Sequence, residues 1–438
     1  MTAKQRIAII GTGISGIGAG LALDHAGHEV VFYEKDRRPG GHSATVDIVH
    51  SREEISVDTG FIVYNELNYP NLTAMFDWLQ VRTQDSDMSF SVSADGGKFE
   101  WCGRNGDGVF RSLFAQRSNL FSPSFIRMLQ EILTFQKKAR SDRAAGTIGS
   151  GTLGDYLTEH KFSQRLRDDY LVPMGAAIWS TSPAKMLEFP AQSFIDFWDN
   201  HCLLQWDRPQ WRTVHGGSRN YVRRALRGFG DRLRLNAGVT QVTRHGSNVS
   251  VVDVTGHSDT FDHVIIGAHA PDALAMLTDA TALEQKVLSA CSYSPNTVIL
   301  HRDPSLMPRR KDAWAAWNFL RNGKDDTRKV AVTYWMNILQ GINKDLPTFV
   351  TLNPPFEPDP ALTFARFTYE HPLFDTAALE ARHHLNEMQG QSRTWFCGAW
   401  TGHGFHEDGL RSGLEVAAAL GAQAPWLVPA AREPVAAE

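Results

Sequence analysis

IAIIGTGISGIGAGLALDHAGHEVVFYE, residues Ile7–Glu34, is the stretch that decides the fold of this chain. An apolar run leads into the pattern Gly11-x-Gly13-x-x-Gly16, a periodic segment of small and apolar residues follows, and a second apolar run ends on Glu34. This order predicts a strand, a tight turn, a helix and a second strand. It is the unit that binds a dinucleotide.

Each residue type in this unit has a physical reason. Gly11 allows the tight turn, Gly13 lets a pyrophosphate approach the backbone, and Gly16 lets the helix pack close to the strand. Unpaired N–H groups at the start of the helix favour the phosphates. Glu34 can accept hydrogen bonds from both ribose hydroxyls and disfavours a 2′-phosphate, so we expect NAD or FAD and not NADP.

Composition limits the class of protein. The 438 residues suit two domains, and a net charge of −4 offers no basic surface for nucleic acid. The four cysteines are scattered, which predicts a reducing compartment without a disulfide framework or zinc site. The first strand begins near Arg6, leaving no room for a signal peptide, and no apolar run is long enough to span a membrane. We therefore expect a cytoplasmic protein.

Strand-like segments of similar character recur near residues 235–267 and 395–398, so the nucleotide domain is predicted to be interrupted by insertions. We place it at 1–90, 210–275 and 390–424, the substrate domain at 91–209 and 276–389, and a disordered Pro/Ala-rich tail at 425–438. Twelve tryptophans and 24 phenylalanines crowd the middle of the chain. They indicate either a large aromatic core or an apolar substrate tunnel.

Four segments together resemble one enzyme superfamily. They are the fingerprint, the turn Gly40-Gly41-His42-x-x-Thr45, Val239 with the strand Val264–Gly267, and the closing segment Phe396–Gly413. They are similar to the flavin-containing amine oxidase, protoporphyrinogen oxidase and phytoene desaturase superfamily. The resemblance implies FAD as cofactor and an α/β plus α+β fold. In that fold a Rossmann-like FAD-binding domain of the glutathione reductase/amine oxidase type carries an inserted substrate domain of mixed sheet and helices.

The resemblance also implies where FAD lies. His42 replaces the arginine of the superfamily's Gly-Gly-Arg motif, which alters one phosphate contact. In the superfamily the closing segment aims a helix N-terminus at the flavin's pyrimidine ring, where reduced flavin carries negative charge. The implied FAD-binding residues are Gly11, Gly13, Ile14, Ser15, Gly16, Glu34, Lys35, Gly41, His42, Thr59, Gly60, Phe61, Val239, Gly398, Asp408, Gly409 and Leu410.

Three further segments and the loop 404–409 narrow the match. The segments are Leu300–Pro308, Ala313–Asn318 and Thr333–Asn337. They resemble a bacterial subgroup of predicted NAD/FAD-binding proteins that is related to the N-terminal half of plant cyclopropane fatty acid synthases. Genes of this subgroup often stand beside fatty-acid methyltransferase genes, and some members are implicated in desaturating methyl-branched acyl chains on the way to furan fatty acids. The resemblance thus implies a lipid or other apolar substrate and a fatty-acid methyltransferase partner.

Other activities of the same fold stay open. The chain could oxidise an amine, a porphyrinogen or a carotenoid, or it could be a non-catalytic flavoprotein that assists the methyltransferase. Alignment of Asn296–Leu300 with the amine oxidase strand that carries a lysine puts Leu300 at the lysine position, which speaks against ordinary amine oxidation. No second glycine fingerprint follows, so we expect the electrons to pass to oxygen, a quinone or another acceptor and not to come from NAD(P)H.

Two histidines and two acids share the loop 400–408. We predict that His406 or Glu407 is the proton acceptor near the flavin, with His403 and Trp400 also at the catalytic site. The alternative is a loop that only holds flavin. The pair His403-x-x-His406 lacks a third ligand at matching spacing, so no metal is predicted.

The segment Phe110–Lys138 is rich in Phe, Leu, Ile and Met and has basic residues at its end. One interpretation is an amphipathic surface that touches the inner face of a membrane. The other, which we favour for the periodic part from Phe125, is a helix packed in the substrate domain. The two interpretations are compatible if the helix frames a tunnel mouth.

Overall fold

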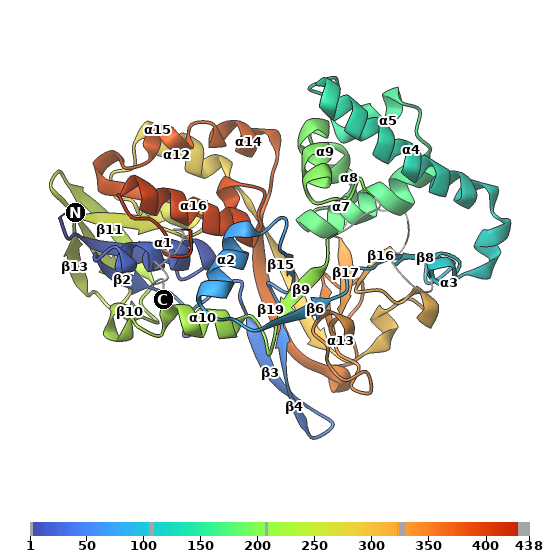
Figure 1. Cartoon of the computed structure of the whole chain (residues 1–438), viewed down its shortest axis with the longest axis horizontal. Helices are drawn as coiled ribbons and strands as arrows, with labels where there is room; N and C mark the ends of the chain where they lie inside the picture. The colour runs from blue at the N-terminus through green and yellow to red at the C-terminus, as the bar shows by residue number, and fades with distance from the viewer. Residues whose placement is uncertain (1–2, 105–108, 206–208, 322, 324–329, 428–438) are drawn as a thin grey trace, which may run out of the picture.

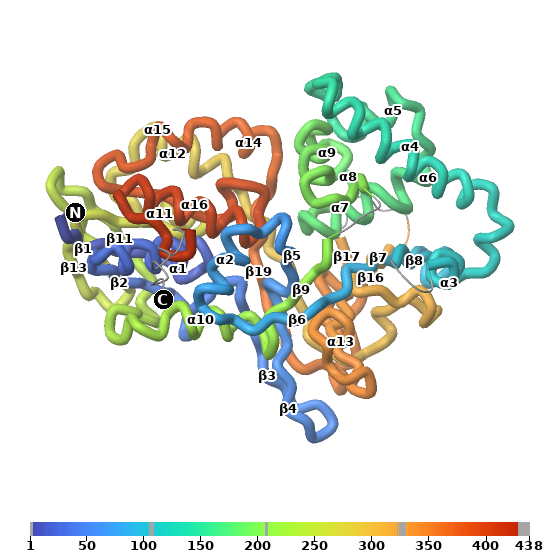
Figure 2. Tube along the Cα trace, in the orientation of Figure 1, coloured from blue at the N-terminus to red at the C-terminus, as the bar shows by residue number. Residues whose placement is uncertain are grey.

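In the computed structural model the chain forms two lobes (Figure 1). The structure describes residues 3–104, 109–205, 209–321, 323 and 330–427. Most of the tail predicted to be disordered, 428–438, therefore lies outside the described residues. Strands β6 (Thr83–Ser86) and β9 (Trp211–Val214) pair antiparallel, where the chain first enters the right-hand lobe and first returns from it (Figure 2).

The left-hand lobe is built on a parallel five-stranded sheet. Its strands, in spatial order, are β10 (Leu233–Arg234), β2 (Glu29–Tyr33), β1 (Arg6–Ile10), β14 (His263–Ile266) and β20 (Thr394–Phe396). The apolar runs of the sequence become these strands because both faces of the sheet are covered, and Ile7, Ala8 and Ile9 are fully buried. Since all neighbours run parallel, the loops that follow β1, β14 and β20 meet at one edge.

Helix α1 (Ile14–His25) follows β1, and helix α16 (His406–Ala419) lies against it. The two helices approach closely because small residues face each other. A Cβ atom on Gly413 would lie 2.1 Å from the Ser15 carbonyl oxygen, and one on Gly18 would lie 2.3 Å from Leu410 Cδ1. This contact brings the closing segment of the chain to the glycine fingerprint at its start.

The right-hand lobe is built on a mixed seven-stranded sheet, covered by helices on the upper side in Figure 1. Its strands, in spatial order, are β19 (Thr363–Pro372), β15 (Tyr293–His301), β18 (Phe349–Leu352), β17 (Ala331–Trp335), β16 (Trp317–Arg321), β7 (Phe90–Ala94) and β8 (Phe99–Gly103). The lobe's helices are α3 (Val109–Leu113), α4 (Pro123–Ala145), α5 (Leu153–Glu159), α6 (Gln164–Leu166), α7 (Val172–Trp179), α8 (Pro183–Leu187), α9 (Ala191–Asn200) and α13 (Met336–Leu339).

Smaller elements complete the molecule. The remaining strands form three small sheets: β3 (Thr45–His50) with β4 (Glu53–Asp58); β5 (Tyr64–Asn65), β9 (Trp211–Val214) and β6 (Thr83–Ser86); and β11 (Val239–His245), β12 (Asn248–Asp253) and β13 (Ser258–Phe261). The other helices are α2 (Pro70–Trp78), α10 (Arg219–Leu226), α11 (Ala270–Met276), α12 (Ala282–Ala290), α14 (Thr376–Arg382) and α15 (Leu385–Met388).

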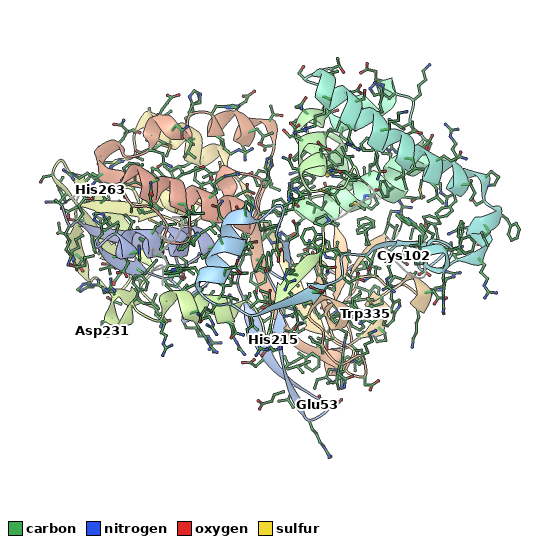
Figure 3. All side chains as sticks on the ribbon, viewed as in Figure 1. Glu53, Cys102, His215, Asp231, His263 and Trp335 are labelled. Atoms are coloured by element: carbon green, nitrogen blue, oxygen red, sulfur yellow. The ribbon has the colours of Figure 1, made fainter. Side chains whose placement is uncertain are left out.

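Both large sheets draw on distant parts of the chain. All strands of the five-stranded sheet come from the ranges predicted for the nucleotide domain, and the seven-stranded sheet takes its strands from the ranges predicted for the substrate domain, except that β7 begins at Phe90. Side chains fill both lobes, with His263 in the first and Trp335 in the second (Figure 3). The predicted fold class, a Rossmann-like domain with an inserted substrate domain, is confirmed.

The apolar stripe of α4 packs inward. Phe125, Met128 and Phe135 are fully buried in the core of the substrate lobe, as the packed-helix interpretation requires. Among the residues that the structure describes, no helix combines the length and apolar composition needed to cross a bilayer. All four cysteines are free and buried.

Candidate functional site

The turn after β1 is tied to Glu34. The Glu34 carboxylate accepts hydrogen bonds from the Thr12 N–H at 3.0 Å, from the Thr12 hydroxyl, and from the Asp36 N–H at 3.0 Å. The carboxylate is thereby fixed beside the glycine turn at the carboxyl edge of the sheet. This is the position that the sequence predicted for the residue that binds the ribose hydroxyls.

Strand β10 brings Val239 to the same edge. The Ala237 N–H donates to the Glu34 carbonyl at 2.8 Å, so the segment that leads to Val239 runs alongside Glu34. A Cβ atom on Gly238 would lie 3.1 Å from Lys35 Cβ. The structure thus brings together Glu34, Lys35 and Val239, three of the residues predicted to hold the adenosine half of FAD.

The Gly-Gly-His turn is paired with the segment 59–61. The Phe61 N–H donates to the His42 carbonyl at 2.8 Å, and a Cβ atom on Gly60 would lie 2.2 Å from that same oxygen. Gly41 approaches the fingerprint from the other side, since a Cβ atom on it would lie 3.4 Å from Gly13 Cα. Two predicted parts of the FAD site, distant in sequence, are therefore neighbours.

The residues present fit the phosphates of FAD. Helix α1 begins after Gly13, no side chain caps its first N–H groups, and nothing lies within 4 Å of where a Gly13 Cβ would be. His42 Nε2 is buried and has no hydrogen-bond partner among the residues that the structure describes. An uncapped helix N-terminus with open space beside it is an anion site. The unpartnered imidazole nitrogen of His42 is available to a ligand in the same turn.

The closing segment is shaped by Asp408. Its carboxylate accepts hydrogen bonds from the His403 N–H at 3.0 Å and the Phe405 N–H at 3.1 Å, and it pairs with Arg411 at 2.9 Å. The Gly398 N–H donates to the Ser412 hydroxyl at 2.9 Å, which fixes the start of the loop to α16. Asp408 therefore orders the backbone of the loop, and its assignment to flavin binding stays a prediction.

Glu407 points away from this loop and into the protein. Its carboxylate accepts hydrogen bonds from the Asn71 N–H at 3.0 Å, the Asn71 side-chain amide at 2.6 Å and the Leu72 N–H at 3.0 Å. Burial raises its pKa, and these donors oppose the rise. The geometry makes Glu407 a clamp on the first turn of α2. The sequence prediction of Glu407 as proton acceptor does not agree with this orientation.

His406 is also enclosed. Its ring stacks on Phe61 with 3.7 Å between centroids, and its Nε2 lies 3.0 Å from the Ser43 hydroxyl and 3.3 Å from the Tyr221 hydroxyl. Burial lowers the pKa of His406 to about 3, so the imidazole is neutral. Ser43 and Tyr221, which hydrogen-bond to each other, were not predicted as site residues.

His403 faces the substrate lobe instead. Its ring centroid lies 6.0 Å from that of Phe197 on α9, and Phe197 stacks on Phe405 at 5.0 Å and on His201 at 3.8 Å. Burial lowers the pKa of His403, and the Asp408 carboxylate opposes this shift. A cluster of two histidines and two phenylalanines thus joins the closing loop to α9. We call His201, Phe197, His403 and Phe405 the junction cluster.

His201 was missed because its signal is not local. The ring nitrogen Nδ1 lies 3.0 Å from the Phe197 carbonyl oxygen, which can only accept, so Nδ1 carries the proton. In the neutral ring Nε2 is then the basic nitrogen. Burial lowers the pKa of His201 to about 4. His201 is therefore a neutral base at pH 7.

Trp400 has a packing role. It is 3% exposed, and a Cβ atom on Gly398 would lie 2.7 Å from its ring. Its indole N–H has no hydrogen-bond partner among the described residues. The structure thus places Trp400 against the first residue of the closing loop. Within the described part of the chain, no three His, Cys, Asp or Glu side chains group as a metal site.

The strand aligned with the amine oxidase lysine strand is β15. Leu300 is fully buried in the core of the substrate lobe. On the same strand, the buried Asn296 has its side-chain amide nitrogen 3.3 Å from His371 Nδ1. His371 in turn lies 5.6 Å from His42, ring to ring, so substrate-lobe strands reach the Gly-Gly-His turn.

Comparison with known proteins supports the same assignment. The model of the flavin-containing amine oxidoreductases matches residues 14–337. Wild-type putrescine oxidase bound to putrescine covers 95% of this chain and 99% of its own, with a TM-score of 0.67 and 16% identity. The match to cyclohexylamine oxidase from Brevibacterium oxydans covers 95% of this chain and 98% of that one, with a TM-score of 0.67 and 16% identity. The match to the CLA-producing fatty acid isomerase from P. acnes covers 96% of this chain and 99% of that one, with a TM-score of 0.67 and 14% identity.

At these identities the solved structures establish the fold alone. No curated protein matches the chain in a sequence search. The family model, in contrast, spans well over half of the chain and covers the fingerprint helix as well as much of the substrate lobe. Its cofactor is FAD, which the turn at Gly13, the Glu34 carboxylate and the uncapped helix α1 fit. This protein belongs to the flavin-containing amine oxidoreductases, and it is an FAD-dependent oxidoreductase.

Proposed function

We propose that this oxidoreductase desaturates a lipid-borne acyl chain that carries a methyl branch. The observation that carries the proposal concerns the acids of the closing segment. The carboxylates of both acids, Glu407 and Asp408, accept hydrogen bonds from backbone N–H groups of the protein. No acid of this loop is left to pair with a substrate ammonium, so an uncharged substrate fits it better than an amine.

The side chains that pack against the loop are apolar and aromatic. Phe197 is 2% exposed and lies 4.6 Å from Trp179 and 5.0 Å from Phe405, ring to ring. The imidazoles among these rings, His201 and His403, have lowered pKa values and are neutral at pH 7. An apolar site with a few polar groups suits an acyl chain, and dryness protects the reduced cofactor.

The chemistry needs one hydride acceptor and one base. Bound FAD supplies the two-electron acceptor at N5. Two C–H bonds of adjacent carbons break and a C=C bond forms. FAD, once bound, would take up one hydrogen as hydride, and an imidazole of the protein would take up the other as a proton. We assign the proton to His201 Nε2, since Nδ1 is already protonated and held by the Phe197 carbonyl. Turnover then requires dioxygen or a quinone as external electron acceptor.

Two further considerations support an acyl substrate. The sequence resembles the subgroup linked to methyl-branched fatty acids, and one structural neighbour is named as a fatty acid isomerase. Leu300, aligned with the amine oxidase lysine, is core and fully buried. The amine oxidase neighbours support the competing candidate, amine oxidation.

Anaerobic mixing tests the proposal. The holoenzyme is mixed with a methyl-branched phospholipid dispersed in mild detergent, and the visible absorbance of oxidised flavin is followed. Bleaching by the branched lipid, with a new double bond detected in the lipid by mass spectrometry, is the expected result. The unbranched lipid is the matched control. Bleaching by putrescine or cyclohexylamine and not by any lipid would replace the proposal with amine oxidation.

A further inference from the structure

The end of the substrate lobe turns apolar side chains outward. Phe121 is 87% exposed and Phe110 is 67% exposed, while Leu120 is 39% exposed. They come from α3 and from the 3-10 helix η1 (Arg117–Phe121), which follows it in the chain. Single exposed apolar residues are ordinary, but three on adjacent elements form a patch of the kind that marks an interaction site.

Two polar side chains of the same segment, Gln116 and Asn119, are bound to the neighbouring hairpin instead. Asn119 is 4% exposed, and its amide donates to the Glu100 carbonyl at 2.9 Å. The Gln116 amide donates to the Lys98 carbonyl at 2.9 Å, and its oxygen accepts from the Glu100 N–H at 2.8 Å. These bonds fix η1 to strand β8 and its hairpin. The orientation of η1 is therefore fixed, because Gln116 and Asn119 are bonded to the sheet, and this orientation places Phe121 outward.

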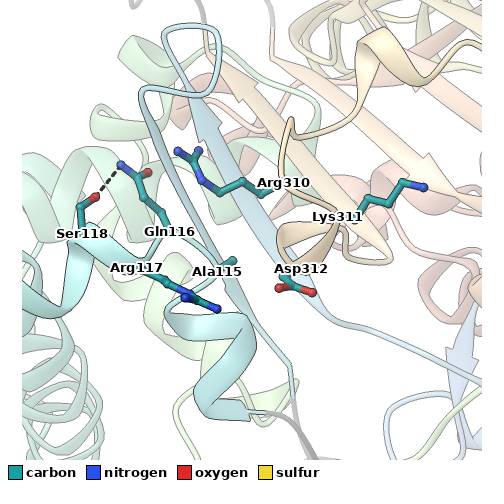
Figure 4. A pocket seen from close by; sticks show the side chains of 7 residues that line it. All are labelled: Ala115, Gln116, Arg117, Ser118, Arg310, Lys311 and Asp312. Atoms are coloured by element: carbon teal, nitrogen blue, oxygen red, sulfur yellow. Dashed lines mark hydrogen bonds between the residues drawn. The ribbon is translucent and has the colours of Figure 1, made fainter.

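Cations lie on the elements that carry and adjoin this apolar patch. A shallow pocket of about 560 Å³ lies between η1 and the 3-10 helix η5 (Lys311–Ala313). Figure 4 shows Arg117 and Ser118 on one side of it and Lys311 and Asp312 on the other. The exposed residues Lys98 and Arg309 lie on neighbouring turns, where a Cβ atom on Gly97 would meet the Arg309 side chain at 2.7 Å.

The acids of this surface are already paired. Asp312 is bound by Arg111 at 2.7 Å, and the fully buried Glu100 is bound by Arg310 at 2.9 Å. Arg117 and Lys311 have no acidic partner among the residues that the structure describes. Their charge is available to an external anion. Aromatic side chains beside free cations match a bilayer with anionic headgroups better than they match a second protein of this net charge.

We propose that the surface formed by α3, η1 and η5 docks on an anionic phospholipid bilayer. Phe110 and Phe121 enter the headgroup region, and Arg117 and Lys311 lie against lipid phosphates. The choice of lipid as the partner rests on the proposed function, since an enzyme that acts on phospholipid acyl chains works at a membrane. The apolar stripe of α4 itself stays in the core, so the contact is made by the tip of the lobe.

Vesicle co-sedimentation of the holoenzyme tests this docking. The expected result is binding to vesicles of phosphatidylcholine with phosphatidylglycerol, weak binding to phosphatidylcholine alone, and release by high salt. Phe121→Ser should weaken binding roughly tenfold or more, and Phe121→Trp should retain it. Arg117→Glu should weaken it roughly fivefold or more. Val254→Ser, at a residue 64% exposed in the other lobe, and Lys344→Glu are the matched controls.

Three outcomes would overturn the docking. They are no binding to anionic vesicles, equal loss in Val254→Ser and Phe121→Ser, or a dimer of the free protein that Phe121→Ser separates. The last would make the patch an interface between copies. Flavin reduction by detergent-dispersed lipid does not need the bilayer. Loss of vesicle binding in Phe121→Ser with unchanged reduction therefore tests the docking apart from the proposed function.

Discussion

The ring of His406 lies face to face on the ring of Phe61, with 3.7 Å between centroids and 14° between planes. One ring begins the last helix of the nucleotide domain, and the other ends the segment beside the Gly-Gly-His turn. The contact joins two segments that were predicted to hold FAD and that lie far apart in the chain. His406 is enclosed by it, which leaves proton transfer to a base on the substrate side.

Glu34→Gln should weaken FAD binding. The charged carboxylate organises the turn through the Thr12 and Asp36 N–H groups and offers oxygen atoms to the ribose. Loss of a charged hydrogen bond costs about 1.5–3 kcal/mol, so the Kd for FAD should rise by at least about tenfold. Fluorescence titration of the apoprotein measures it. Glu29→Gln is the control, since Glu29 begins strand β2, which ends just before Glu34, and is paired with Arg6. Equal Kd values for both variants would remove Glu34 from the site.

Glu407→Gln should lower the free energy of unfolding and have little effect on the rate of flavin reduction. The carboxylate holds the first turn of α2 through three donors, so the free energy of unfolding should fall by about 1–3 kcal/mol. Urea denaturation measures this, with the 70% exposed Glu415→Gln as control. A variant of full stability whose flavin is no longer reduced by substrate would restore Glu407 as the proton acceptor.

His201→Gln should slow flavin reduction while FAD content stays unchanged. General base catalysis contributes roughly 10²–10⁴-fold, so stopped-flow reduction should slow by that order. The pKa of His201 is lowered to about 4 by burial, so the wild-type rate should be flat at neutral pH and fall as the pH drops through about 4. His257→Gln, in the turn before β13 of the nucleotide lobe, is the control. An unchanged reduction rate in His201→Gln would end its assignment as base.

Asp58 should make stability depend on pH. Burial raises its pKa from 3.8 to about 6, so the folded state binds this proton more tightly than the unfolded chain. Its contribution is present below pH ~4 and is lost as the pH rises to about 6, amounting to about 3 kcal/mol. Urea unfolding of Asp58→Asn beside the wild type isolates this slope. Parallel pH profiles for the two proteins would contradict it.

Gly413→Ala should separate the two helices of the FAD site. Its Cβ would lie 2.1 Å from the Ser15 carbonyl oxygen, which is backbone and cannot rotate away. Overpacking of this kind costs about 1–3 kcal/mol or more, and FAD retention should fall with the lost alignment of α1 and α16. Thermal unfolding and bound-flavin absorbance report both effects. Gly228→Ala, where nothing lies within 4 Å, should change neither.

The local pattern of the sequence was enough for the nucleotide fold. The glycines, the apolar runs and Glu34 are close in sequence, and each has its effect through its own backbone geometry. Val239 could be assigned through the resemblance. The structure then brought it beside Lys35, because parallel strands align their carboxyl ends.

The direction of the catalytic side chains came from tertiary structure alone. Glu407 and His403 are close in sequence, yet their side chains point to different partners. The Glu407 carboxylate is bound by Asn71, 336 positions away, and the His403 ring lies 6.0 Å from the Phe197 ring of the substrate lobe. His201 carries no local signal, since only the meeting of α9 with the closing loop places it near the site. The sequence by itself determined FAD and the Rossmann-like fold. Tertiary structure decided which polar groups are hydrogen-bonded within the protein and which are left for a ligand or substrate, because their partners are distant in the chain.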